Sequence, residues 1–154
     1  MPLQFALMLP RTSCIVDCGA SLWIICVMPQ KTEYVAEKGM IVISYSGKVT
    51  IEEVREATVQ AIAMQKEGRT DLVLIDAMIM TAWPSLVDMW HLVESYPQLE
   101  APRRTRLAAI RPQVPGKTDV SGFFETVCTN RCYNAKAFHI RKDAEGWLRA
   151  EDNA

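Results

Sequence analysis

The chain has 154 residues, a formal net charge of −1 and 49% hydrophobic residues. That length fits one domain with an ordinary core. The near-neutral charge gives no general electrostatic attraction to nucleic acid, so we expect no nucleic-acid partner. Five cysteines are present. An odd number without regular spacing argues against a disulfide framework and favours a reducing compartment, so we expect a cytoplasmic protein.

Residues 1–29 are expected to form an extension in front of the folded part. This stretch is apolar, contains three of the cysteines and shows neither a strand nor a helix period. It lacks the basic start and the small-residue cleavage site of a secretory signal. Two interpretations stay open: a functional signal or anchor, and upstream sequence in front of a natural translation start at Met28. We favour the second, with a domain at residues 30–150 and a tail at 151–154.

The rest of the chain alternates short apolar strands with amphipathic helices. The expected order is a two-stranded hairpin, a helix, and then strand and helix three times. The expected ranges are 33–37, 40–47, 51–66, 72–76, 84–96, 106–110, 118–130, 135–140 and 144–150. Such alternation predicts an α/β fold with a five-stranded, mostly parallel sheet and about four helices.

Capping residues support the helix boundaries. Thr50 followed by Glu53 is a capping box at the start of the first helix, and Gly68 suits the position just beyond its end. Thr118 and Asp143 are the expected caps of the third and fourth helices.

The segment between the strand at 72–76 and the second helix is unusual. Residues 77–83 read AMIMTAW, and a connecting loop is normally polar. We expect an apolar loop here, followed by a helix with Pro84 in its first turn. Asp76, at the end of the preceding strand, is expected to cap the turn.

The order of elements, together with four short segments, resembles the STAS domain and, more closely, the SpoIIAA-like family of small stand-alone bacterial proteins. The segments are Gly47-Lys-Val-Thr50, Leu72-Val-Leu-Ile-Asp76, Arg106-Leu-Ala-Ala-Ile110, and Phe138 with Asp143-Ala-Glu-Gly-Trp-Leu148. The resemblance covers about residues 30–150. The SpoIIAA-like family is also related in fold to CRAL-TRIO lipid-carrier domains. The resemblance therefore implies that small apolar ligands or membrane association are possible.

The resemblance also implies a second function. STAS proteins that antagonise anti-sigma factors carry a phosphorylated serine after the third strand, in an Asp-Ser-Ser-Gly type motif. That motif is absent here, and the nearby hydroxyl groups are those of Thr81 and Ser85. A phosphate on either would lie near a helix N-terminus, which is electrostatically favourable. The alternative function is therefore a regulatory protein–protein interaction module with a possible phosphosite at Thr81 or Ser85.

Two groups of side chains are candidates for a ligand site. Methionine and tryptophan, which adapt to varied partners and favour interfaces, gather in residues 78–90, and basic residues follow the strand at 106–110. The predicted ligand-binding residues are Met78, Met80, Trp83, Met89, Trp90, Arg111 and Lys117. The ligand would be a fatty acid, a phospholipid or another apolar small molecule, with any head group on the basic side chains. The alternative for the methionine and tryptophan residues is ordinary core packing or a contact within a homodimer.

No motif predicts chemistry. Gly116-Lys117-Thr118 resembles the end of a phosphate-binding loop, but the glycine that the motif requires is replaced by Arg111. Cys128 and Cys132 share a helix face without two further metal ligands, which favours core cysteines. We therefore expect no catalytic residue, cofactor or metal. The leading hypothesis is a non-enzymatic binding protein in the cytoplasm, either free or peripheral at the inner membrane face.

Overall fold

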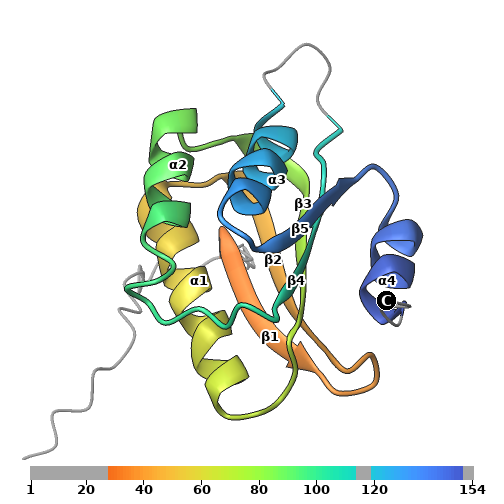
Figure 1. Ribbon diagram of the computed structural model, residues 1–154. Coiled ribbons are helices and arrows are strands. Elements are labelled where there is room, and N and C mark those ends of the chain that lie inside the picture. The colour runs from red at the N-terminus through yellow and green to blue at the C-terminus, as the bar shows by residue number, and fades with distance from the viewer. Residues whose placement is uncertain (1–27, 114–118, 151–154) are drawn as a thin grey trace, which may run out of the picture.

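The computed structural model describes residues 28–113 and 119–150, and the interpretations of residues 1–27, Lys117 and the tail lie outside these ranges. One five-stranded sheet has the order β1-β2-β3-β4-β5 (Figure 1). β1 pairs antiparallel with β2, and the other three pairs are parallel. In chain order the elements are β1 (Gln30–Val35), β2 (Met40–Lys48), α1 (Ile51–Lys66), β3 (Leu72–Ala82), α2 (Leu86–Glu94), β4 (Arg106–Ile110), α3 (Val120–Asn130), β5 (Asn134–Phe138) and α4 (Arg141–Arg149). The predicted α/β architecture is confirmed.

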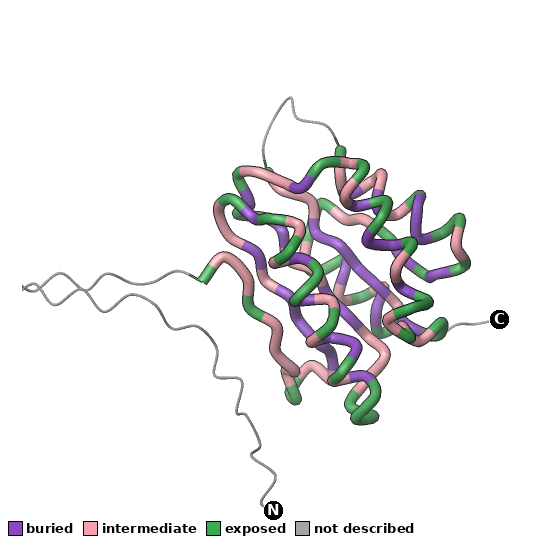
Figure 2. Tube along the Cα trace, turned by 90° about the vertical axis from the view of Figure 1, so that its left-hand side faces the viewer, coloured by how far each residue is buried: buried purple, intermediate pink, exposed green. Residues whose placement is uncertain are grey.

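The two faces of the sheet are covered unequally. Helices α1, α2 and α3 lie on one face, and α4 lies on the other (Figure 1). The larger core fills the three-helix side, and a smaller core under α4 includes Met40, Leu74 and Leu148. Figure 2 shows the buried strands between helices whose outer faces are exposed. Most of the helical cover therefore lies on the face of the sheet that holds the larger core.

Strand β3 is longer than predicted. The prediction of an apolar loop at residues 77–83 is wrong, because most of this segment belongs to the strand. The strand continues to Ala82, and β2 continues to Lys48 beside it. Ser46 faces Ile79 and Gly47 faces Met80 in this extension, whereas β4 pairs with β3 only as far as Asp76. Two register shifts interrupt the pairing of β2 with β3. They break the alternation of inward and outward residues, which is why the sequence shows no strand period here.

The capping predictions had mixed outcomes. α1 has the predicted bounds and both hydrogen bonds of the Thr50 capping box, and Gly68 has the positive φ of +76° that suits a residue beyond a helix end. The N-cap of α3 is Asp119 rather than Thr118. The prediction that Asp143 caps α4 is wrong, because that helix starts at Arg141, three residues earlier than predicted, and its N-cap, Ile140, makes no side-chain capping hydrogen bond.

Candidate apolar ligand site

An apolar cavity of about 70 Å³ lies between the sheet and helices α1, α2 and α3. β2 and β3 supply its floor, and α2 supplies part of the opposite wall. Its lining includes Tyr45, Ala77, Met80, Trp83, Met89 and Phe124. The cavity lies toward the carboxyl ends of the parallel strands, where α/β folds usually bind ligands. It is the leading candidate for a functional site.

A bulge in β3 aims the side chains at this cavity. Between Ser44–Asp76 and Ser46–Ile79, β3 contains one residue more than β2. The Asp76 Oδ1 atom accepts a hydrogen bond from the Met78 backbone nitrogen at 3.1 Å within the bulge, so the prediction that Asp76 caps this turn is confirmed. As a result Ala77 and Met80, three positions apart, both line the cavity. A regular strand would have placed alternate residues there.

The structure separates the predicted ligand-binding residues into two groups. Met80, Trp83 and Met89 line the cavity. Met78 and Trp90 do not, and their side chains are 37% and 36% exposed. Strand alternation after Ala77 turns Met78 outward, and the bulge then keeps Ile79 outward and brings Met80 into the cavity. On α2, Met89 lines the cavity whereas the next residue, Trp90, lies at the surface. Trp90 lies edge-on to His91 and carries the Arg131 guanidinium over its ring at 5.3 Å.

The basic group predicted to hold a ligand head group is not assembled at the cavity. Arg111 forms an ion pair with Asp119, the residue that caps α3, and it does not line the cavity. Its charge is therefore compensated within the protein. Lys117 lies outside the described residues. A head-group role for these two residues stays a prediction.

The polar groups at the cavity are uncharged donors. The Trp83 indole Nε1 atom is buried and has no hydrogen-bond partner among the residues that the structure describes. Burial, followed by the nearby Glu53 carboxylate, raises the pKa of Tyr45 above its usual range. Burial also raises the pKa of Tyr96, with smaller contributions from Cys128, Tyr45 and Tyr133. Both phenols therefore stay neutral.

A second cavity, of about 40 Å³, adjoins the first along the same face of the sheet. Gln65, Thr105 and Tyr133 give it a more polar lining than the first cavity has. The sequence analysis missed it, because its polar residues come from three distant segments. The one available signal was a glutamine on the apolar face of α1.

The possible phosphosites differ in their surroundings. Ser85 is the N-cap of α2, and its Oγ accepts from the Asp88 nitrogen at 3.1 Å. The same Oγ donates to the Asp88 carboxylate at 2.7 Å. A phosphate on Ser85 would displace this cap and meet the negative charge of Asp88. Thr81 is exposed on β3.

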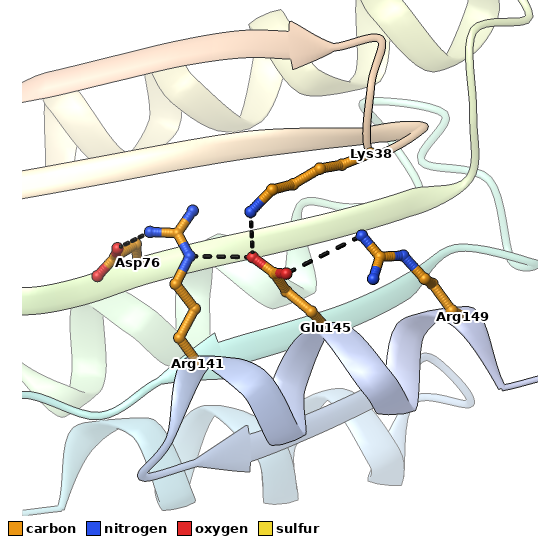
Figure 3. Close-up of polar contacts among 5 residues, drawn as sticks. All are labelled: Lys38, Asp76, Arg141, Glu145 and Arg149. Carbon is orange, nitrogen blue, oxygen red and sulfur yellow. Dashed lines mark hydrogen bonds and ion pairs between the residues drawn. The ribbon is translucent and has the colours of Figure 1, made fainter.

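On the opposite face, a charged network that the sequence analysis missed joins α4 to the sheet (Figure 3). Glu145 lies at its centre and is bound by Lys38 at 2.6 Å and by Arg141 at 3.0 Å. Arg141 also binds Asp76, the residue that holds the bulge. The network therefore connects α4 to the strand whose bulge shapes the cavity.

Two other features of the described residues concern possible chemistry and location. No three His, Cys, Asp or Glu side chains of residues 28–113 and 119–150 are grouped as a metal site would require. No helix within those ranges is long and apolar enough to cross a membrane.

Burial raises the pKa of the Cys128 thiol to about 12, which makes this cysteine unreactive and consistent with a core residue.

Comparison with known proteins indicates no activity. No protein family profile matches the chain, and no curated protein matches it. A similar solved structure is described as an uncharacterized protein from the DUF3478 family with a SpoIIAA-like fold, from Shewanella loihica PV-4. It is 17% identical, the match covers 77% of this chain and 91% of that chain, and the TM-score is 0.48.

Proposed function

We propose that this protein is a non-enzymatic binding module that holds a small apolar ligand in the cavity beneath α2. The observation that carries the proposal is the composition of the cavity wall. It contains aliphatic and aromatic residues, Met80, Met89, and Trp83, whose indole N–H has no partner among the described residues. Ligand sites are mostly apolar with a few polar groups that orient the ligand. This cavity has that composition.

The size of the cavity restricts how a ligand enters. An engineered apolar cavity of about 150 Å³ is known to bind benzene, and the present cavity is about half as large. Binding therefore requires wall side chains to move. Met80 and Met89 are suited to this, because methionine is unbranched and repacks at low cost. Trp83 is only half-buried and lies where the wall meets the surface.

Exposed apolar side chains surround the same segment. Met78, Ile79, Val87 and Trp90 are exposed on β3 and α2, beside the residues that line the cavity. Our proposal is that this outer surface contacts a membrane or a partner that delivers the ligand. Tryptophan is favoured at membrane interfaces. A cytoplasmic protein with reversible contact to the inner membrane face would have this arrangement.

Nuclear magnetic resonance of the methionine methyl groups tests the proposal. On titration of the full chain with 1-octanol, the methyl signals of Met80 and Met89 should shift in a saturable way, whereas that of Met78 should not. Met89→Ala should weaken binding, and Met78→Ala is the matched control that should leave it unchanged. Equal small shifts at all three methionines, or none up to the solubility limit of the probe, would refute the proposal.

The second candidate is the regulatory interaction module. The exposed apolar residues favour it as well, since such residues can form a contact with a protein partner or within a homodimer. The candidate phosphosites are Thr81, which is exposed on β3, and Ser85, whose hydroxyl is bonded to Asp88. Intact-mass analysis of the chain from its own cells, followed by peptide fragmentation to locate any phosphate, tests this: one added phosphate at Thr81 or Ser85 supports it, and an unmodified chain opposes it.

A further inference from the structure

The two cavities follow one groove between α1 and the sheet. Along β3, Val73 and Ile75 line the second cavity, and Ile75 and Ala77 line the first. Along α1, Gln65 lines the second cavity and Thr58 lines both. The shared residues, Ile75 on β3 and Thr58 on α1, lie between those that line only one cavity, so the cavities are consecutive parts of one path that runs parallel to the strands.

Tyr96 lies at the junction of the two parts. It lines both cavities, and its ring lies edge-to-face with that of Tyr133 at 5.3 Å between centroids. Tyr96 and Tyr133 are buried, with 6% and 3% of their surfaces exposed. Joining the two cavities, of about 70 Å³ and about 40 Å³, into one elongated site requires the Tyr96 ring to rotate.

Tyr133, which lines the second cavity, has a buried hydroxyl group. The buried Tyr133 hydroxyl has no hydrogen-bond partner among the described residues. Its polar neighbours are already engaged: Gln65 Nε2 donates to Thr105 Oγ1 at 2.8 Å, and Thr105 Oγ1 donates to the Pro102 carbonyl at 2.7 Å. An unsatisfied buried hydroxyl is unfavourable, so this position favours an occupant that can pair with it.

No charged side chain of the described residues lines either cavity. An ionised carboxylate or phosphate placed there would be desolvated without a counter-ion, which is strongly unfavourable. A hydroxyl or carbonyl group has a much smaller desolvation cost and pairs with a tyrosine hydroxyl. The lining therefore discriminates between neutral and ionised ligands.

We propose that the joined cavities bind one elongated, neutral molecule with a hydroxyl or carbonyl group at one end. The polar end pairs with the Tyr133 hydroxyl, and the apolar part passes Tyr96 and ends beneath Trp83. This inference rests on the proposed function, because it assigns a ligand class and an orientation to the same site. In this orientation the polar group of the ligand contacts Tyr133 and not Arg111, the residue predicted from the sequence to hold a head group.

Three probes of equal chain length test the inference: 1-octanol, 1-fluorooctane and octanoate, each titrated into the full chain and followed by the Met80 and Met89 methyl signals. The wild-type protein should bind 1-octanol at least fivefold more tightly than 1-fluorooctane, which is a poor hydrogen-bond acceptor, and should bind octanoate weakest. Tyr133→Phe should weaken 1-octanol binding about five- to tenfold, as expected for one lost hydrogen bond, and leave 1-fluorooctane unchanged. Tyr34→Phe, which alters a tyrosine outside both cavities, is the matched control and should change neither affinity.

The outcomes distinguish this inference from the proposed function. If both octyl probes shift the two methyl signals but bind equally well, and Tyr133→Phe has no effect, the inference is overturned and the apolar site stands. The same holds if octanoate binds best. If no probe shifts these signals, both proposals fail. The comparison of probes on the wild-type protein holds even if the Tyr133→Phe variant folds poorly.

Discussion

The Arg141 guanidinium of α4 binds the Asp76 carboxylate of β3, with 2.8 Å between Nη1 and Oδ2, although 65 positions separate the two residues. The other carboxylate oxygen of Asp76 accepts from the Met78 nitrogen and holds the bulge. The Asp76 side chain, which Figure 3 shows in contact with Arg141, therefore connects α4 on one face of the sheet to the bulge in β3. The bulge in turn places Met80 in the cavity on the other face.

Removal of Asp76 should destabilise the protein more than removal of its partner. Asp76→Ala loses the ion pair and leaves the Met78 amide without its acceptor, so we expect the free energy of unfolding to fall by about 1–3 kcal/mol. Arg141→Ala should cost only about 0.2–1 kcal/mol, because its side chain is 42% exposed. Urea unfolding measures both. Arg149→Ala, whose contact to Glu145 is 3.9 Å, is the control; an Asp76→Ala effect no larger than that of the control would contradict the role of the bulge.

Glu145 should make stability depend on acidity. Its side chain is 15% exposed, and the Lys38 hydrogen bond, then that of Arg141, holds its pKa below the ordinary value of 4.5 although burial opposes the shift. The unfolded chain therefore binds the proton more readily. The stabilisation is present above about pH 4.5 and is lost as the pH falls through the pKa of the folded state. The stability difference between wild type and Glu145→Gln should shrink below that pH; a constant difference would contradict this.

Two buried hydroxyls should respond oppositely to their removal. Tyr133→Phe removes a hydroxyl that has no partner among the described residues, so the free energy of unfolding should rise by up to about 1 kcal/mol. Thr105→Val removes the acceptor of the Gln65 amide and should cost about 1–3 kcal/mol. Chemical denaturation of the ligand-free protein measures both changes. A destabilised Tyr133→Phe variant would show that the hydroxyl already has a partner, such as a buried water.

The helix caps give a further matched pair. Thr50→Ala removes the capping box of α1 and should cost about 0.5–2 kcal/mol. Asp143→Ala should be close to neutral, because Asp143 lies within the first turn of α4 and is not its N-cap. Thermal unfolding compares the two variants. An equal fall in unfolding temperature for the two variants would mean that the stability of α4 depends on Asp143.

The elements that could be predicted from the sequence are those with regular periods and explicit boundary signals. α1 and β4 have the predicted bounds, and α1 is marked by its capping box and by Gly68. β3 could not be predicted in full, because its second half depends on pairing with β2 across two register shifts. A pairing between distant segments leaves no local pattern in one strand.

The candidate site was predictable only in part for the same reason. The composition of residues 78–90 located the cavity, and three of the five predicted residues in that range line it. The direction in which each side chain points was not predictable without the bulge. Tyr133, Gln65 and Thr105 come together only through the order of the strands and the path of α1. No spacing in the sequence connects them.

The most direct test of the central claim is mass spectrometry of an organic extract of the full chain, purified gently from the cells that encode it. The proposal predicts a neutral, elongated apolar molecule that approaches one per chain. Ala77→Leu, which fills the cavity, is the control and should release much less, provided that its circular dichroism matches the wild type. An extract that contains no such molecule above the level of this variant would contradict the claim that the cavity is a ligand site.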